Sequence, residues 1–174
     1  MSKPIIIKVI TAGEGGVGKT TLLHRYIDDV FLEDTKMTIG VEFFTKDLVI
    51  NGRNISLQLW DLGGQDRFRF LQKSYAKGAK GALLMFDLTR FQSLERIDQW
   101  IEICRTSDPD LPILFVGTKW DLKDQIQIDD EYAKEIQQEH GFFDYIKVSS
   151  LTDENVDEAV EKLVKKILER INSY

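Results

Sequence analysis

The sequence is poor in the residues that mark several classes of protein. Its 174 residues include one cysteine and three prolines. The single cysteine, Cys104, can form no disulfide within the chain, which is typical of a protein in a reducing compartment. The small number of prolines, together with 43% hydrophobic residues, excludes collagen-like and intrinsically disordered proteins. We therefore expect an ordinary globular protein with a single domain over residues 1–174.

Long apolar runs and an excess of positive charge are also missing. No stretch approaches the ~18 consecutive apolar residues of a membrane-spanning helix, and the first apolar run is typical of a strand rather than of a signal peptide. Lysine and arginine number 23 against 29 aspartate and glutamate, a net charge of -6, so we expect no binding to nucleic acid. The C-terminal residues 171–174 contain no cysteine for prenylation. We expect a cytoplasmic protein with no direct membrane anchor.

What the sequence does contain is an alternation of short apolar runs with segments of helical period. This alternation predicts an α/β fold in which a mostly parallel sheet has helices on both faces. We expect about six strands and five helices. The expected parallel strands are residues 5–10, 55–60, 81–86, 113–116 and 145–148.

Two segments predict more specific features of this fold. Residues 41–50 and 55–60 flank Asn51-Gly52-Arg53-Asn54, and Asn-Gly between strand-like runs indicates a hairpin, so one antiparallel edge strand is expected. Residues 156–171 carry apolar side chains at i, i+3 and i+4. This stripe could bind a partner, but packing on the protein's own sheet is the simpler interpretation.

The first predicted strand leads directly into Gly13-Glu14-Gly15-Gly16-Val17-Gly18-Lys19-Thr20. This segment matches the phosphate-loop pattern G-x-x-x-x-G-K-[ST] in the strand-to-helix context that the pattern requires. Glycines let the backbone amides turn toward an anion, and the start of a helix adds a positive dipole. We predict that Lys19 neutralises phosphate oxygens and that Thr20 binds Mg²⁺ through its hydroxyl.

Polar residues also follow three further predicted strands, and in an open α/β sheet ligands bind beyond the carboxyl ends of the strands. They are Asp61, the segment Thr118-Lys119-Trp120-Asp121, and the segment Ser149-Ser150-Leu151. We expect all of them at the same edge of the sheet as the phosphate loop.

With these motifs in order, the chain resembles the Ras superfamily of small GTPases, and most closely its Rab-like branch. The residues that carry the resemblance are 13–20, Thr38-Ile39-Gly40-Val41-Glu42-Phe43, Trp60-Asp61-Leu62-Gly63-Gly64-Gln65-Asp66-Arg67-Phe68 and 118–121. A threonine at position 118 also resembles the fungal septation-initiation GTPases. The resemblance implies a P-loop G domain that binds GTP or GDP with Mg²⁺.

The resemblance also implies roles for individual residues. Gln65 would orient the attacking water, with Lys19, Gly64 and Thr38 completing the catalytic set. The metal would be held by Thr20, by Thr38 and, through water, by Asp61. Motif and resemblance together assign nucleotide contacts to Gly13, Gly15, Gly16, Val17, Gly18, Lys19, Thr20, Thr21, Phe31, Thr38, Gly64, Thr118, Lys119, Asp121, Ser149, Ser150 and Leu151.

The resemblance further implies an effector surface. Phe43, Trp60 and Tyr75 match an aromatic triad by which Rab-like proteins contact effectors, although core packing would explain each ring equally well. Exchange factors and activating proteins are the other expected partners, acting through the two switch segments, and we expect a monomer.

Three departures from the family pattern bear on affinity and rate. Thr118 stands where the family has asparagine, and Ser150-Leu151 stand where it has Ala-Lys, so we predict weaker nucleotide binding. Because Asp121 can accept from N1–H and from the 2-amino group, preference for guanine over adenine should survive. Leu62-Gly63 add backbone freedom before Gln65. No arginine lies in switch I, so intrinsic hydrolysis should be slow, on the order of 10⁻⁴ to 10⁻³ per second.

The sequence therefore predicts a GTP-dependent switch in trafficking or signalling, with two alternatives. One is a nucleotide-locked binding module with little or no turnover. The other is a P-loop kinase or ATPase, which would need an arginine-rich lid that this chain does not offer.

Overall fold

The structure is a computed structural model that describes residues 2–33, 41–64 and 69–173. Its centre is one six-stranded sheet with the strand order β2-β3-β1-β4-β5-β6. The β2 and β3 strands are antiparallel, and every other neighbouring pair is parallel. The predicted sheet, mostly parallel with one antiparallel edge strand, is confirmed. The strands are β1 (Ile5–Ala12), β2 (Val41–Ile50), β3 (Arg53–Leu62), β4 (Gly81–Asp87), β5 (Ile113–Thr118) and β6 (Asp144–Lys147).

The hairpin between β2 and β3 is tighter than the sequence indicates. Ile50 already pairs with Arg53, so the turn contains Asn51 and Gly52 alone and the predicted connection over 51–54 is two residues too long. Both turn residues have positive φ, 51° and 76°. Asn and Gly tolerate this conformation, and a two-residue turn of this kind matches the twist of the strands, so pairing continues up to the turn.

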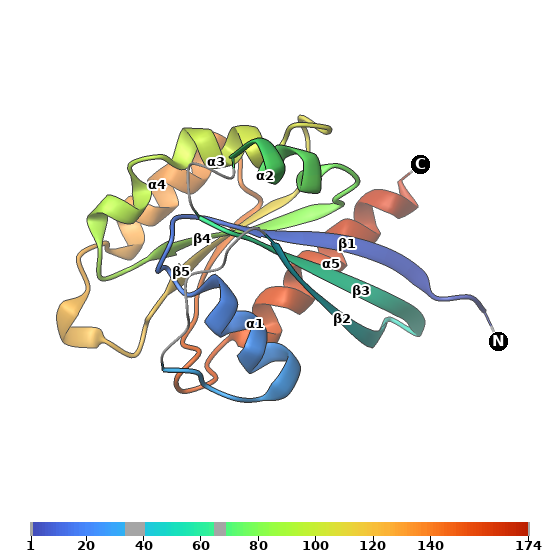
Figure 1. The fold of residues 1–174 in the computed structure, drawn as a ribbon, viewed down its shortest axis with the longest axis horizontal. Coiled ribbons are helices and arrows are strands. Elements are labelled where there is room, and N and C mark those ends of the chain that lie inside the picture. The colour runs from blue at the N-terminus through green and yellow to red at the C-terminus, as the bar shows by residue number, and fades with distance from the viewer. Residues whose placement is uncertain (1, 34–40, 65–68, 174) are drawn as a thin grey trace.

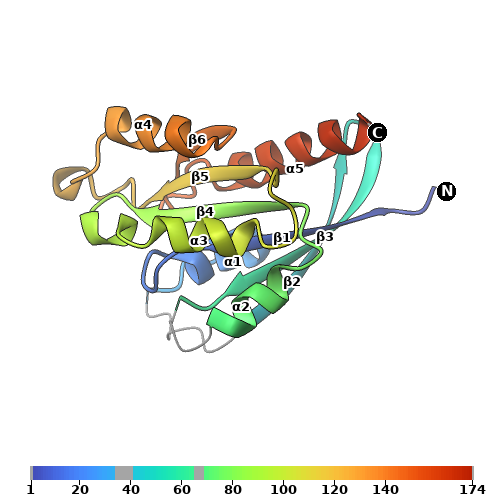
Figure 2. The same cartoon turned by 90° about the horizontal axis from the view of Figure 1, so that it is seen from above.

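Five α-helices cover the two faces of the sheet among the described residues (Figures 1 and 2). They are α1 (Lys19–Asp28), α2 (Arg69–Ala76), α3 (Ile97–Cys104), α4 (Asp130–His140) and α5 (Val156–Asn172), with short 3₁₀ turns at η2 (Phe91–Leu94) and η3 (Lys123–Gln125). The α1 and α5 helices pack on one face, and α2, α3 and α4 pack on the other. None of the helices described here is both long and apolar enough to cross a membrane.

The apolar stripe of α5 packs on its own sheet, as the sequence favours. Val160, Leu163 and Ile167 are buried in the core that α1 and α5 share with the sheet. A β-carbon added at Gly81 of β4 would lie 2.7 Å from Cδ1 of Ile167, so the helix approaches this strand as closely as a glycine permits. The stripe is therefore part of the core.

The parallel strands end at one edge of the sheet, and this arrangement positions the polar segments of the chain. The loop after β1 contains residues 13–18, β4 ends at Asp87, β5 ends at Thr118, and residues 149–151 follow β6 closely. Segments more than 130 residues apart in sequence (for example 15 and 150) thus meet at one edge, as expected of an open α/β sheet.

Candidate functional site

A cavity of about 580 Å³ opens at this edge of the sheet. That volume lies within the range of small-molecule sites. The cavity is lined by Gly15, Gly16, Val17, Gly18, Lys19, Thr20, Thr21, Phe31, Leu32, Glu33, Gly64, Thr118, Lys119, Asp121, Leu122, Ser150 and Leu151. The structure thus brings most of the sequence-predicted nucleotide residues into one cavity, and it adds Leu32, Glu33 and Leu122, which no motif marked.

Side chains hold the carbonyl groups of the loop between β1 and α1. Each carbonyl from residue 13 to residue 17 accepts a hydrogen bond from a side chain: Lys19 Nζ donates to Gly13 and Glu14 at 2.6 and 2.8 Å, Arg90 Nη2 to Gly15 at 3.0 Å, Lys119 Nζ to Gly16 at 3.1 Å, and Thr118 Oγ1 to Val17 at 2.6 Å. These side chains hold the loop by its carbonyl groups, and its glycines allow the backbone N–H groups to turn toward an anion, as in an anion-binding nest.

Lys19 is a buried cation at the bottom of this loop. Lys19 is 6% exposed, and burial lowers its pKa to about 8. The nearby carboxylates of Asp61 and Glu14 oppose this shift, because they favour the charged form. An ammonium group removed from water binds an anion more strongly than an exposed one, since the local dielectric is low. The loop is therefore suited to a phosphate group.

Thr20 and Asp61 supply oxygen ligands beside Lys19. The Thr20 hydroxyl donates to Oδ2 of Asp61, and the Thr11 hydroxyl donates to Oδ1 of the same carboxylate at 2.9 Å. Asp61 is fully buried at the end of β3. No group of three His, Cys, Asp or Glu side chains that could hold a metal occurs among the described residues. The donor set fits Mg²⁺, which prefers oxygen and usually takes one or two protein ligands plus phosphate and water.

The other end of the cavity presents an oriented carboxylate. Ser149 is buried, and its hydroxyl donates to Oδ1 of Asp121 at 2.7 Å. The backbone N–H of Trp120 donates to the carbonyl of Val148 at 3.1 Å, so the segment 118–121 is attached to the chain that follows β6. Asp121 is therefore held as an acceptor at the cavity wall, on the segment that follows β5.

Comparison with known proteins agrees with this geometry. Residues 8–169 match the Ras family. The chain belongs to the Ras family. The Ras-related protein RABA4a of Arabidopsis thaliana is 39% identical over 168 residues, covering 96% of this chain and 74% of RABA4a. Rab-2B of Dictyostelium discoideum is 37% identical over 97% of this chain and 83% of its own length, and human Rab-4B is 36% identical over 97% and 79%. The similarity is to the Rab-like branch, as the motifs indicate.

Thr118, the first departure from the Ras-family pattern, keeps a link to the phosphate loop. Its hydroxyl lies 2.6 Å from the Val17 carbonyl and 3.0 Å from the Phe86 carbonyl. A short hydroxyl reaches the loop because β5 ends beside it. The weaker nucleotide binding predicted for Thr118 stays a prediction. Its cause would have to be something other than the link to the phosphate loop, since that link is present.

The second departure, Ser150-Leu151, is held by a residue that the sequence did not reveal. Arg25 of α1 donates from Nε to the Ser150 carbonyl at 2.7 Å and from Nη2 to the Leu151 carbonyl at 3.0 Å. Arg25 also pairs with Asp29 at 3.2 Å. No sequence signal marks Arg25, because it sits in an ordinary helical pattern 125 residues before Ser150. Arg25 thus holds the backbone of the loop at Ser150 and Leu151, in which the lysine of the family pattern is absent.

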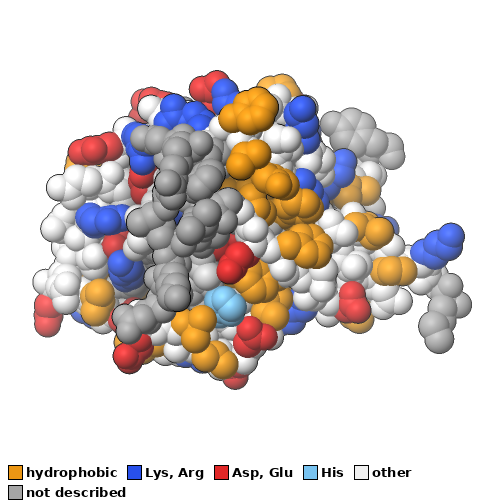
Figure 3. Space-filling view, viewed as in Figure 1, with side chains coloured by type: hydrophobic (Ala, Val, Ile, Leu, Met, Phe, Trp, Pro, Cys, Tyr) orange, Lys and Arg blue, Asp and Glu red, His pale blue; other side chains and the backbone are white. Residues whose placement is uncertain are grey.

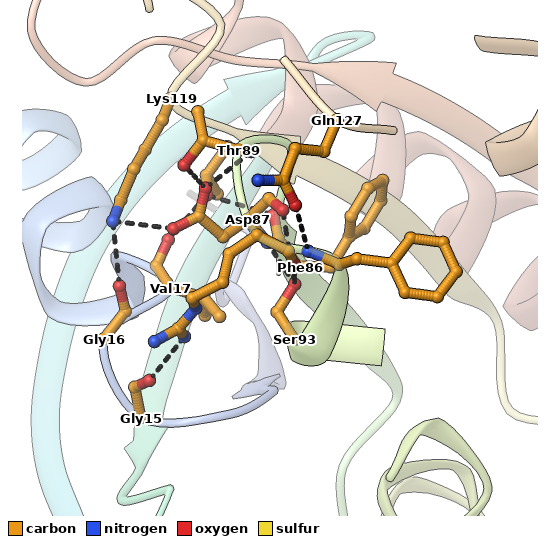
Figure 4. Close-up of polar contacts among 12 residues, drawn as sticks. Gly15, Gly16, Val17, Phe86, Asp87, Thr89, Ser93, Lys119 and Gln127 are labelled. Atoms are coloured by element: carbon orange, nitrogen blue, oxygen red, sulfur yellow. Dashed lines mark hydrogen bonds and ion pairs between the residues drawn. The ribbon is translucent and has the colours of Figure 1, made fainter. Parts of the chain in front are cut away.

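Asp87 organises two further supports of the phosphate loop (Figure 4). Its side chain is 2% exposed, and its carboxylate pairs with Lys119 at 2.8 Å while accepting from the backbone and hydroxyl of Thr89. The Arg90 backbone N–H donates to the Asp87 carbonyl, and the Arg90 side chain reaches Gly15. The sequence marked neither Asp87 nor Arg90, since both lie in a segment without a motif.

The predicted switch residues are only partly placed. Thr38 and Gln65 lie outside the described residues. Gly64 lines the cavity and packs against the phosphate loop so closely that a β-carbon there would collide with the backbone nitrogen of Gly15. Position 64 therefore requires glycine for steric reasons, in addition to the amide contact predicted for it.

The three aromatic rings that the sequence marked lie together, with Phe43 exposed and Trp60 and Tyr75 partly buried against the core. The ring centroids of Phe43 and Trp60 are 5.2 Å apart, and those of Trp60 and Tyr75 are 5.5 Å apart. Phe43 is 51% exposed, so core packing does not account for it. Hydrophobic side chains gather over α2 and the β2–β3 hairpin in the space-filling view (Figure 3). Such a patch on a monomer commonly marks an interaction surface.

Proposed function

We propose that this Rab-like protein binds GTP and GDP with Mg²⁺ and slowly hydrolyses GTP to GDP and phosphate. The observation that supports this most directly is one cavity with a phosphate loop at one end and the Ser149-oriented carboxylate of Asp121 at the other. A carboxylate that accepts from N1–H and the 2-amino group favours guanine, because adenine has an acceptor at N1 and no 2-amino group. GTP is therefore preferred over ATP.

The residues divide the work of binding and hydrolysis. Backbone amides of residues 15–19 and the Lys19 ammonium bind the phosphates, and Gly64 donates its amide to the terminal phosphate. Thr20, Thr38 and, through water, Asp61 would hold Mg²⁺, which would neutralise charge on the phosphate oxygens. Gln65 orients the water for in-line attack, and the bond between the terminal phosphorus and its bridging oxygen breaks as the new one forms.

The same contacts would make the protein a switch in membrane trafficking or signalling. Thr38 and Gly64 are held while the terminal phosphate is present, and its loss releases both segments. Effectors then dissociate from the surface that contains Phe43, Trp60 and Tyr75. Exchange factors and activating proteins act on the same segments of a cytoplasmic monomer, and an activating protein supplies the arginine that speeds hydrolysis.

Two measurements on one preparation test the nucleotide binding in this proposal. Calorimetry with GDP, GTP and ATP in the presence and absence of Mg²⁺ is expected to show magnesium-assisted uptake of the guanine nucleotides only. Chromatography of the denatured protein should identify GDP or GTP as the nucleotide that co-purifies. Absence of uptake at millimolar guanine nucleotide would refute the proposal.

Turnover is tested separately from binding. Single-turnover phosphate release should be slow, and Gln65→Leu should lower it while nucleotide affinity stays unchanged. An equal rate in the variant removes Gln65 from catalysis. Tight binding with no phosphate release at all would identify a nucleotide-locked module.

A further inference from the structure

The Thr118 hydroxyl is enclosed by two backbone carbonyls. Thr118 is 4% exposed, and its Oγ1 lies 2.6 Å from the Val17 oxygen and 3.0 Å from the Phe86 oxygen. A hydroxyl has one proton and two lone pairs. If the proton turned toward a ligand in the cavity, both lone pairs would face carbonyl oxygens. The proton is therefore used inside the protein and is not available to a bound base.

The other charged and hydroxyl side chains near the base end are also occupied. Lys119 Nζ binds the Gly16 carbonyl and the Asp87 carboxylate, and the Ser149 hydroxyl donates to Asp121. The Arg25 guanidinium binds the carbonyls of Ser150 and Leu151. Among the residues that the structure describes, Ser150 also has a hydroxyl on this part of the cavity wall.

Guanine presents donors and acceptors on different edges. N1–H and the 2-amino group are donors and fit the Asp121 carboxylate, whereas O6 and N7 are acceptors that need donors from the protein. Backbone N–H groups of Ser150 and Leu151 are suited to O6, whereas that of Ser149 donates to the Glu154 carbonyl at 3.0 Å. Since the hydroxyl of Thr118 is directed at Val17 and Phe86, N7 finds no donor at this position.

We propose that this pocket recognises guanine nucleotides without reading N7, and that Thr118 is a positioning residue that joins β5 to the phosphate loop. The inference rests on the guanine-nucleotide binding proposed above. It extends the ligand class to nucleotides of 7-deazaguanine, in which a C–H group replaces N7. It also assigns base selectivity to Asp121 rather than to Thr118.

The test is competition of unlabelled nucleotides against a fluorescent GDP analogue on the full chain with Mg²⁺. GDP and 7-deaza-GDP should bind with affinities within about twofold of each other. If N7 accepts no hydrogen bond from the protein, replacing it with C–H should change the affinity little. IDP, which lacks the 2-amino group, should bind at least about fivefold more weakly, since one donor to Asp121 is lost.

Two variants of Thr118 report on its role. Thr118→Asn adds an amide that can donate one N–H to Val17 and a second to N7, so GDP should gain a preference of about three- to tenfold over 7-deaza-GDP. Thr118→Val removes the link to the phosphate loop and should weaken both nucleotides by the same factor. Thr118→Ser, the conservative control, keeps the hydroxyl. This variant should bind both nucleotides as tightly as the unmodified protein does, with a ratio of the two dissociation constants near one.

A preference of the unmodified protein for GDP over 7-deaza-GDP by fivefold or more overturns the inference. Ser150→Ala then identifies the donor, because loss of the preference in that variant assigns the contact to Ser150. The unmodified protein decides the question even if the asparagine variant does not fold. Failure of both nucleotides to bind at millimolar concentration refutes guanine-nucleotide binding itself, a result distinct from unequal binding.

Discussion

The proposed phosphate end and the proposed base end of the cavity are built in different ways. At the phosphate end a continuous segment, residues 13–20, provides the amides, Lys19 and Thr20 from one loop and the helix that follows it. At the base end, Thr118 and Asp121 follow β5, Ser149 to Leu151 follow β6, and Arg25 comes from α1. The groups at the first end come from one local segment, although Arg90, Lys119 and Thr118 hold its carbonyls. The groups at the second end come from separate segments that the strands place side by side. Two of the three departures from the family pattern, Thr118 and Ser150-Leu151, lie at the base end, where contacts from Thr118 and Arg25 hold the neighbouring backbone.

The largest expected effect is at the phosphate end. Lys19→Met removes the buried cation while keeping most of the side-chain volume, and affinity for GDP and GTP should fall by about 100-fold or more, because charge-assisted contacts to phosphate are lost. Equilibrium binding measures the loss. Lys165→Met is the matched control, since Lys165 is an exposed lysine of α5 that pairs with Glu161. Near-normal affinity of Lys19→Met for GDP and GTP would show that the backbone amides of the loop bind the phosphates without the lysine.

Loss of the magnesium effect is the next largest expectation. Thr20→Val keeps the shape of the side chain and removes its hydroxyl, so Mg²⁺ should no longer slow GDP dissociation, an effect of about tenfold or more. Stopped-flow measurement of dissociation with Mg²⁺ and with a chelator compares the two states. If magnesium still slows release in the variant, Thr20 is not a metal ligand.

A moderate effect is expected at the base end. Arg25→Gln removes the two hydrogen bonds that hold the carbonyls of Ser150 and Leu151, so the loop should loosen and the preference for GDP over ADP should fall by about fivefold. Arg53→Gln is the control, because Arg53 binds Asn172 near the chain end, away from the cavity. An unchanged GDP to ADP ratio would show that the loop holds its shape without Arg25.

The smallest effect is expected for the support of Gly15. Arg90→Gln removes the hydrogen bond to the Gly15 carbonyl on the outside of the phosphate loop, and affinity for GDP and ADP should fall together by about threefold. The same competition assay used for Arg25 measures both nucleotides. A change in the GDP to ADP ratio would contradict the division of the cavity into a phosphate end and a base end.

Some features of the fold and of the site could be predicted from the sequence, and others could not. The alternation of apolar runs predicted the sheet and the helices on both faces, and Asn51-Gly52 predicted the antiparallel edge strand; all three are confirmed. The phosphate-loop motif predicted a ligand site from a single local segment. The length of the β2–β3 turn was wrong by two residues, because the sequence does not say how far pairing continues past Ile55 toward Asn51. Arg25, Asp87 and Arg90 were missed, since an arginine in a helix or a buried aspartate at a strand end has no distinctive local pattern.

The sequence by itself determined the order of strands and helices and the phosphate loop, because apolar periodicity and glycine conformation are local properties of the chain. Only the tertiary structure decided that Thr118 directs its hydroxyl at Val17 and Phe86, and that Arg25 supports the loop at Ser150. Those contacts join segments about 30 to 125 residues apart. They form because parallel strands bring their carboxyl ends to a single edge of the sheet.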